Sequence, residues 1–207
     1  AGEMLMPMAG IGFNDMENRA TRYAGRGGLG AVLGSKGLKA IVVDSDGAPA
    51  TIPLADPDLF KAGQKKLVNA LQTHALTKPG GALNAYGTDV LINVLNEAGG
   101  LPTRNFSSGR FEGAAKVSGE ALAEGVKVRG AGMMGHNCSP GCIIKCSNVW
   151  PKLDKTEAAS CMEYESVWSL GPNCGIDDLD QIAEMVTLCN ELGLDTIEAG
   201  VTLGVAM

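Results

Sequence analysis

Three cysteines lie close together in the segment Cys138–Ser–Pro–Gly–Cys142–Ile–Ile–Lys–Cys146. The Pro–Gly pair between the first two favours a tight turn. Cys142 and Cys146 have the i, i+4 spacing that places two side chains on one helical face. Thiolates are the soft anionic ligands of iron–sulfur clusters and structural zinc sites. The segment therefore predicts a metal or cluster site for which it supplies three ligands.

The cysteines alone leave both kinds of site open, because each needs a fourth ligand. Cys161, Cys174 and Cys189 offer further thiols, whereas His136 stands only two residues before Cys138, an awkward spacing for joint ligation. The structural alternative is three ordinary buried cysteines, since cysteine is commonly buried and chemically idle. The tight spacing beside Pro–Gly favours ligation over that alternative.

A second candidate site is the glycine-rich segment 10–37. Residues 25–30 match the dinucleotide-binding pattern G-x-G-x-x-G, but that pattern should follow a strand, and the preceding residues show no strand period. Residues 30–36 resemble a phosphate loop with Ser and Lys in the wrong order. What remains is a run of glycine amides that could hold a phosphate or form a tight solvated loop, flanked by Arg19, Arg22, Arg26 and Lys36.

Two carboxylates, Glu163 and Glu165, stand just before Trp168 and a Gly–Pro turn. A buried carboxylate at this place could act as a general acid or base. The alternative, a solvated helix end, is favoured by the local sequence taken alone. Asp195 likewise has a complete structural explanation as a helix N-cap.

The elements that position these residues are mostly helices. Asp178 begins one whose apolar positions recur at helical spacing, Gly193 ends it, and a capping box over 195–198 begins the next. Asp56 and Pro57 begin an earlier helix. Further helices are expected from Gly87 or Thr88 to Gly99, and over 118–124.

The first part of the chain has a different composition. Leu38–Val43 is a short β-branched run that predicts a strand, Asp46–Gly47 predicts a turn, and 48–53 resembles an extended linker. We therefore predict a mainly α fold in two parts. Residues 1–47 form the end of a sheet-bearing domain, and residues 48–207 form an incomplete helical domain.

Composition limits the possible partners. The chain has 207 residues with 45 % apolar residues, so it can bury a core. Its net charge of −6 and its 4 % aromatic content argue against nucleic acid and anionic membranes as main partners. No apolar run reaches the roughly 20 residues of a membrane span. Neither end has the features of a natural terminus, so we expect a fragment of a longer protein.

Five sequence blocks, taken in order, resemble the tungsten-containing aldehyde ferredoxin oxidoreductase family. The resemblance covers nearly the whole chain, and five ordered blocks are more specific than any single motif. The blocks are AGRGGLGAVLGSKGLKAIVV (Ala24–Val43), LPTRNF (Leu101–Phe106), the cluster of Cys138, Cys142 and Cys146, EYESVWSLGPNCGIDDLD (Glu163–Asp180) and CNELGLDTI (Cys189–Ile197).

The resemblance implies a cytoplasmic enzyme much longer than this chain. In the family, an N-terminal β domain cradles one face of a tungsten (or molybdenum) bis-pterin, and two mostly helical domains cover the other face. A [4Fe–4S] cluster lies beside the cofactor. Family members oxidise an aldehyde with water to a carboxylic acid and pass two electrons through the cluster to ferredoxin. A homo-oligomer is possible.

The resemblance also assigns roles to residues. Cys138, Cys142 and Cys146 match the first three cluster ligands, although the family spacing C-x₂-C-x₃-C is one residue longer here in its first gap. The fourth ligand lies beyond Met207, which makes the other cysteines core residues.

Further matches concern the pterin and the metal. Arg22, Ala24, Gly25 and Arg26 match a pterin-binding loop. Asn190, Leu194 and Asp195 match the family's D-x-x-G-L-D loop, with Asn190 in place of the first Asp. Glu165 matches the carboxylate near the metal, with proton transfer during water attack as its implied role, and Glu163 is the fallback.

Two other functions stay open at this point. One is a related tungsten or molybdenum reductase of carboxylates or aromatic thioesters. The other is a cysteine-ligated metal-binding interaction module without catalysis. Metal analysis of the full-length protein separates the enzymes from the module. Zinc alone would exclude both the aldehyde oxidoreductase and the related reductase. The fragment by itself is expected to be inactive.

Overall fold

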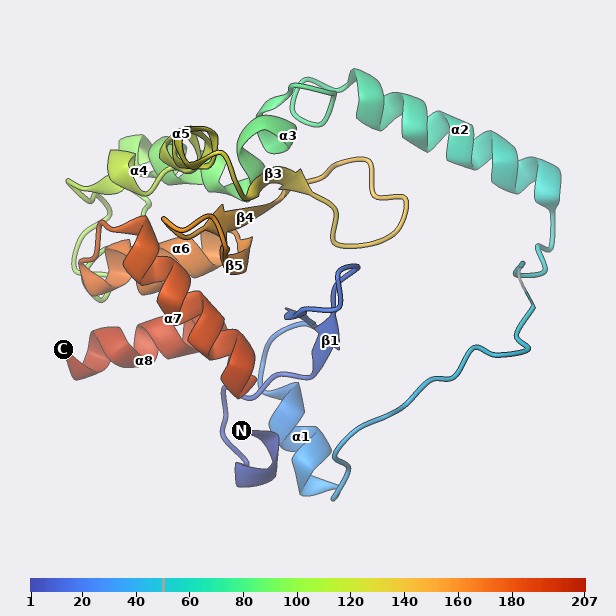
Figure 1. Ribbon diagram of the computed structural model, residues 1–207, viewed down its shortest axis with the longest axis horizontal. Coiled ribbons are helices and arrows are strands. Elements are labelled where there is room, and N and C mark those ends of the chain that lie inside the picture. Colours follow the sequence, from blue (N-terminus) through green and yellow to red (C-terminus); the bar gives the residue numbers. More distant parts are fainter. Residues whose placement is uncertain (50) are drawn as a thin grey trace.

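The computed structural model describes residues 1–49 and 51–207, so the predicted linker 48–53 includes one position, Ala50, outside the described residues. Helices dominate (Figure 1), which confirms the mainly α fold class. The α-helices are α1 (Leu29–Ser35), α2 (Pro57–Thr73), α3 (Ala82–Tyr86), α4 (Leu91–Ala98), α5 (Gly119–Arg129), α6 (Tyr164–Leu170), α7 (Leu179–Leu192) and α8 (Thr196–Ala206). Short 3₁₀ turns are η1 (Gly2–Met4), η2 (Gly87–Val90), η3 (Ala114–Lys116) and η4 (Pro172–Cys174).

The strands form two small antiparallel sheets. β1 (Gly12–Asn14) pairs with β2 (Ala20–Tyr23). β3 (Met133–His136), β4 (Ser147–Pro151) and β5 (Glu157–Met162) form a sheet in the order β3-β4-β5. The sequence analysis missed this second sheet, because its strands are short and the ladders shift register within both pairings.

Side-chain caps fix where α2, α5, α7 and α8 begin, as predicted for the helices after Asp56, Asp178 and Asp195. Asp56, Ser118, Asp178 and Asp195 each accept hydrogen bonds from backbone N–H groups in the first turn that follows. Gly193 ends α7 in the left-handed conformation, with φ of 73°, which glycine adopts without steric cost. These boundaries follow from local chemistry and were therefore readable from the sequence.

The predicted strand Leu38–Val43 was wrong. The segment is extended but irregular, and Ile41, Val42 and Val43 are 73 %, 91 % and 85 % exposed. A strand requires a partner for its backbone groups, and none of the described residues pairs with this segment.

The core lies among α4 to α8 and the β3-β4-β5 sheet. Its fully buried side chains include Ile92, Leu122, Val167 and Ile182. Asp180 accepts two hydrogen bonds from Arg129, at 2.7 and 2.8 Å, and a third from Trp150 Nε1 at 2.8 Å. This cluster joins α5, β4 and α7. The core thus packs together α6, α7 and α8, the helices that carry much of the predicted site.

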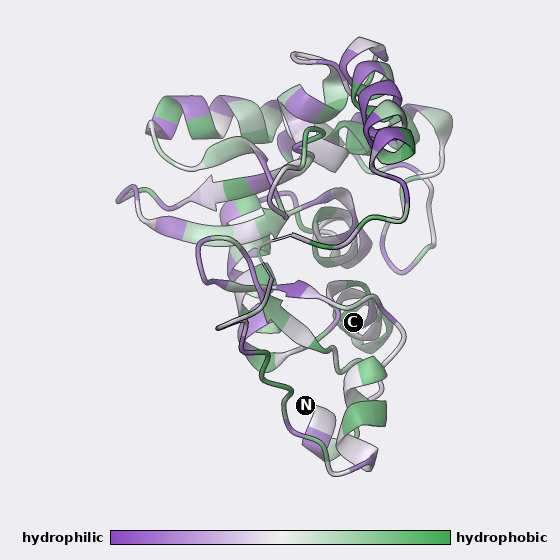
Figure 2. Ribbon diagram, turned by 90° about the vertical axis from the view of Figure 1, so that its right-hand side faces the viewer, coloured by the Kyte–Doolittle hydropathy of each residue, from purple (hydrophilic) through white to green (hydrophobic). Residues whose placement is uncertain are grey.

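The N-terminal segment lies side by side with the turn between α7 and α8 (Figures 1 and 2). Ala9 and Leu194 form an isolated antiparallel bridge. Gly10 N donates to Gly193 O at 2.9 Å, and Asp195 N donates to Met8 O at 2.8 Å. Segments far apart in sequence therefore meet at this place.

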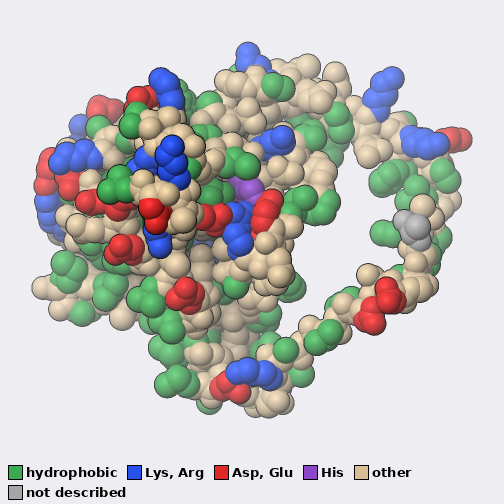
Figure 3. All heavy atoms as spheres, in the orientation of Figure 1, with side chains coloured by type: hydrophobic (Ala, Val, Ile, Leu, Met, Phe, Trp, Pro, Cys, Tyr) green, Lys and Arg blue, Asp and Glu red, His purple; other side chains and the backbone are tan. Residues whose placement is uncertain are grey.

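The helix α2 stands apart from the rest at the end of an extended segment (Figures 1 and 3). None of its residues is buried. Among the described residues, no helix combines the length and apolarity needed to cross a bilayer.

We predict that Gly200→Ala destabilises the 207-residue chain by about 1–3 kcal/mol. An added Cβ at Gly200 in α8 would lie 2.3 Å from the backbone oxygen of Ser169 in α6, so the two helices must separate. Thermal unfolding followed by circular dichroism measures the effect.

Gly63→Ala in α2 is the matched control, because its Cβ would meet nothing within 4 Å. That change should stabilise the helix by about 0.5–1 kcal/mol. Equal shifts in both variants would contradict the α6–α8 packing described here.

Candidate cofactor-binding site

A cavity of about 300 Å³ opens where the hairpin and the glycine loop face the start of α6 and the α7–α8 turn. It brings together most of the predicted cofactor-binding residues and one predicted cluster ligand: Arg22, Gly25, Arg26, Cys138, Asn190, Leu194 and Asp195. Ala24, Cys142, Cys146 and Glu165 are not among the residues that line it. Tyr23, which belongs to the matched segment 22–26, also lines it, as do residues that sequence reasoning did not predict, among them Thr21, Ser166 and Thr196.

The glycine loop is shaped by its backbone conformation. Gly25, Gly27 and Gly28 have φ of 73°, 90° and 75°, a region that other residues enter only with strain. Gly28 also lacks room for a side chain, since an added Cβ would lie 2.4 Å from Pro7 O. The loop follows β2 and precedes α1, so the expectation that no strand precedes it was wrong. Its sheet is an antiparallel hairpin and not the βαβ unit of a dinucleotide site.

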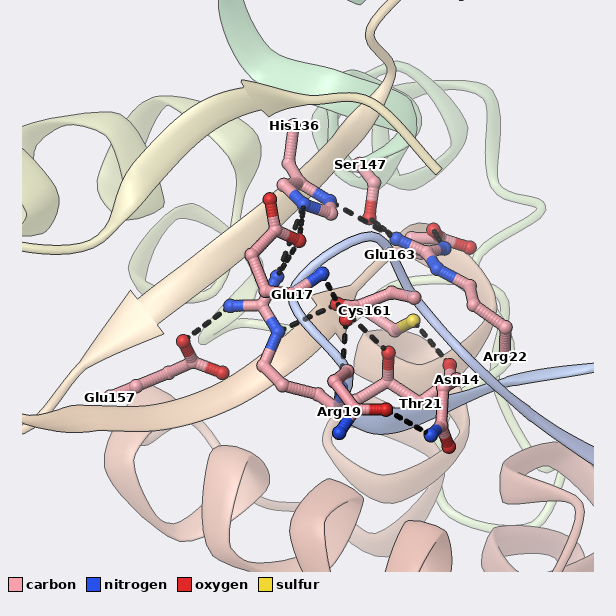
Figure 4. Close-up of polar contacts among 12 residues, drawn as sticks. Asn14, Glu17, Arg19, Thr21, Arg22, His136, Ser147, Glu157, Cys161 and Glu163 are labelled. Carbon is pink, nitrogen blue, oxygen red and sulfur yellow. Dashed lines mark hydrogen bonds and ion pairs between the residues drawn. The ribbon is translucent and has the colours of Figure 1, made fainter. Parts of the chain in front are cut away.

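Arg22 is one of the two arginines that line the cavity, and Figure 4 shows its polar contacts. It donates to Glu163 Oε1 at 2.9 Å and to Ser147 Oγ at 3.0 Å, and its Nη2 lies 3.3 Å from His136 Nδ1. Its Nε is buried and has no partner among the described residues. Buried donors are almost always satisfied, so this atom marks a place for an additional acceptor.

Arg19 anchors the hairpin to the β3-β4-β5 sheet (Figure 4). It pairs with Asp15 at 2.6 Å, with Glu17 at 2.9 Å, and with Glu157 of β5. Ligand atoms of Asp15, Glu17 and His136 lie within 4.8 Å of one another. Arg19 already occupies this group, because it pairs with both carboxylates and its Nη2 lies 3.1 Å from His136 Nε2, so the group is an ion-pair network.

Asp195 has two simultaneous roles. Its Oδ1 caps α8 by accepting from Ile197 N at 2.8 Å and from Glu198 N at 3.2 Å, and its Oδ2 lies 2.8 Å from Arg26 Nε. Nearby, Tyr23 donates from its hydroxyl to Asn190 O at 3.0 Å. Burial and the negative charge of a Cys189 thiolate raise the pKa of Tyr23 to about 12, so it stays a neutral donor. A helix cap and a ligand contact are compatible at this turn.

The three clustered cysteines lie in the loop between β3 and β4. The predicted shared helical face of Cys142 and Cys146 was wrong, because the loop that carries them is irregular and forms no helix. Cys138 is exposed, the other two are half-buried, and all three are free. Burial raises the pKa of Cys146, with smaller contributions from Glu163 and from the other two thiols. The three sulfurs are thus within electrostatic reach of one another.

The three sulfurs are not gathered at one point. In the described part of the chain, the one set of three potential ligands whose atoms lie within 4.8 Å of one another is the Asp15 group. Ligation of a cluster or of zinc by Cys138, Cys142 and Cys146 therefore stays a prediction.

Cys161 of β5, which we expected to be a core cysteine, lines the cavity and is only partly buried. Its φ is 63°, and its Sγ donates to Thr21 O at 2.7 Å. Burial, with the nearby Glu163, raises the pKa of Cys161 to about 11. Cys174 and Cys189, by contrast, are buried as predicted.

The two predicted carboxylates take different positions. Glu163, at the N-cap position of α6, lines the cavity and pairs with Arg22. Glu165 lies in the first turn of α6 and is half-buried. Glu163, the second of the two predicted candidates, thus lines the cavity, and the role of Glu165 stays a prediction.

Comparison with known proteins identifies the family. The model described as "Aldehyde ferredoxin oxidoreductase, domains 2 & 3" matches residues 63–207, and the corresponding N-terminal domain matches residues 1–45. The chain belongs to the aldehyde ferredoxin oxidoreductase family. These matches include the glycine loop, the cysteine loop and the α7–α8 turn. Every residue that lines the cavity therefore lies in a segment that the family models match.

Curated relatives in this family are tungsten-containing aldehyde ferredoxin oxidoreductases. The protein of Pyrococcus furiosus is 44 % identical over the whole chain, and that of Thermococcus kodakarensis is 43 % identical. The protein of Pyrococcus abyssi is 41 % identical over 95 % of the chain. The chain spans 31 % of the length of the first two relatives.

We predict that Cys161 reacts slowly with iodoacetamide in the metal-free chain at pH 8. The thiolate is the reactive form, and with a pKa of about 11 little thiolate is present at that pH. Cys138, which is exposed, is the internal control and should be labelled first. Mass spectrometry of peptides at timed intervals measures both, and equal rates would contradict the burial of Cys161.

Proposed function

We propose that the full-length protein oxidises an aldehyde with water to a carboxylic acid at a tungsten (or molybdenum) bis-pterin. Two electrons then pass through a [4Fe–4S] cluster to ferredoxin. Family membership supports the reaction class, and the names of the relatives support tungsten, the aldehyde and ferredoxin. This chain would supply part of the cofactor cavity and three of the cluster ligands.

The observation that carries the proposal is the cavity wall itself, which contains two arginines, Arg22 and Arg26, and the glycine loop, and the Nε of Arg22 is buried without a partner among the described residues. Guanidinium and amide donors bind phosphate oxygens well. Across the cavity, Asp195 offers a carboxylate that can accept hydrogen bonds from pterin amines. This donor and acceptor set fits a pterin phosphate and the pterin ring. A plain metal-binding module would need neither.

When bound, the metal centre supplies the two-electron chemistry of the oxidation. The protein's own residues bind, orient and handle protons. Arg22 and Arg26 hold the anionic part of the cofactor, and Asp195 orients its ring. Glu165, or Glu163 beside it, accepts the proton that water loses as it attacks the aldehyde carbon.

The cysteine loop adds the electron path. Cys138 lines the cofactor cavity, while Cys142 and Cys146 lie further along the same loop. A cluster held by these thiolates would therefore lie directly beside the cofactor. Such a short separation suits electron transfer from the metal centre to the cluster.

We predict that Arg22→Gln lowers the pterin and tungsten content of the purified full-length protein at least tenfold. Hydrogen bonds to charged groups contribute about 1.5–3 kcal/mol, and the change removes such donors from the cavity. Metal analysis by mass spectrometry and fluorescence of the oxidised pterin measure the content.

Arg104→Gln is the matched control for this change. Arg104 also pairs with a glutamate, Glu112, but both side chains are at least half exposed and lie outside the cavity. Its cofactor content should equal that of the wild type. Equal loss in both variants would show that the effect is not specific to the cavity.

We predict that Glu165→Gln lowers kcat for aldehyde oxidation by about 10²–10⁴, the usual contribution of general acid–base catalysis, with tungsten and iron content unchanged. Glu163→Gln, tested in parallel, decides which carboxylate transfers the proton. Glu124→Gln, an exposed change in α5, is the control. Normal turnover in the Glu165 variant would remove that residue from the mechanism.

A further inference from the structure

Asp89 is a completely buried carboxyl group that the proposed reaction does not use. It lies in η2 and is 0 % exposed. Its Oδ2 accepts one hydrogen bond, from Asn148 Nδ2 at 3.0 Å, and its Oδ1 has no partner in the described part of the chain. Asn148, also 0 % exposed, is held in turn by a bond from its Nδ2 to Tyr86 O at 3.0 Å.

The turn η2 connects this carboxyl group to the candidate site. Thr88 Oγ1 accepts a hydrogen bond from Tyr164 N at 3.0 Å, at the first residue of α6. Thr88 N donates to Cys146 O at 3.1 Å. Asp89 therefore directly follows Thr88, whose hydroxyl binds the first residue of α6. Glu163 and Glu165 lie on either side of that first residue, Tyr164.

In the part of the chain that the structure describes, no cation pairs with Asp89. Among the described residues, the salt bridges do not include it. The charged groups nearest η2 on the elements packed against it are acidic. They are Glu163 and Glu165 at the start of α6, Glu120 in the first turn of α5, and Glu97 in α4. The two cations of α5 lie in its last turn and pair with Glu124 and Asp180.

An ionised carboxylate in this position would be costly. Burying a charge without a counter-ion and with a single donor is strongly unfavourable, and the acidic neighbours add repulsion. Burial, followed by the charges of Glu163 and Glu165, raises the pKa of Asp89 well above its usual range. A protonated side chain needs no counter-ion, so the neutral form fits the site.

We propose that Asp89 is a neutral carboxylic acid and the positioning residue for the α6 carboxylates. It fills the buried corner beneath the start of α6 without placing a third negative charge beside Glu163 and Glu165. The positioning role rests on the proposed function, since it presumes that an α6 carboxylate transfers the proton. The neutral state of Asp89 is independent of the proposed function.

The neutral state gives a stability signature with a defined sign. A folded-state pKa above the unfolded value means that the native protein binds the proton more tightly. Stability is then fully present below the usual Asp pKa of about 3.9 and is lost as pH rises through the raised folded pKa. Asp89→Asn keeps the shape and stays neutral, so it should remove this component of the pH dependence.

The first test uses the full-length protein at several pH values. Infrared spectroscopy should show the carbonyl band of a protonated carboxyl at neutral pH, shifted in D₂O and absent in Asp89→Asn. The melting temperature of the wild type should fall with rising pH more steeply than that of this variant. Asp58→Asn, an exposed change in α2, should behave like the wild type. Absence of the band in the wild type, or equal slopes in all three proteins, would overturn the proposal.

The second test uses the pH profile of aldehyde oxidation. Asp89→Asn should keep kcat at neutral pH within about tenfold of wild type, with KM unchanged. Removal of a catalytic acid or base would instead lower kcat by roughly 10²–10⁴. It should also extend activity to higher pH. A profile identical to wild type overturns the positioning role. If the wild type oxidises no aldehyde, the infrared and melting results still decide the state of Asp89, and the proposed function alone fails.

Discussion

The candidate site depends on arginine–carboxylate pairs that join the first residues of the chain to its helical body. Arg19 pairs with Glu157 of β5, Arg22 with Glu163 at the start of α6, and Arg26 with Asp195 before α8. Each pair joins residues more than a hundred positions apart in sequence. Charge-assisted bonds of this kind are strong and directional. Loss of one partner leaves a partly buried charge unpaired, so the two walls of the cavity are held together by the residues that line it.

The same arginines can serve a ligand without leaving their partners. A guanidinium carries five N–H donors, and a carboxylate on one side leaves donors free on the other. The buried Nε of Arg22 is one such donor. The glycine loop complements it, because positive φ at three of its glycines turns the backbone without side chains that would fill the cavity. A preassembled anion site can therefore exist before any cofactor binds.

Much of the helical structure could be predicted from the sequence, whereas the sheets could not. Asp56, Asp178 and Gly193 determine helix ends through bonds within one turn, and such local chemistry is visible in a short window. Leu38–Val43 has strand composition but no partner among the described residues, and β4 is paired although it contains Trp150 and Pro151. Pairing is non-local, so composition could decide neither case. That Glu163 rather than Glu165 lines the cavity was not visible in the sequence for the same reason, since it depends on where Arg22 lies.

The start of α6 separates two electrostatic environments. On the cavity side, Glu163 pairs with Arg22 at 2.9 Å. On the core side, Asp89 has one amide donor and, among the described residues, no cationic partner, and burial raises its pKa well above its usual range. Two neighbouring carboxyl groups thus have opposite surroundings, because one helix end separates the arginine-lined cavity from the buried core. The proposed neutral state of Asp89 leaves the core side of this helix end without a negative charge.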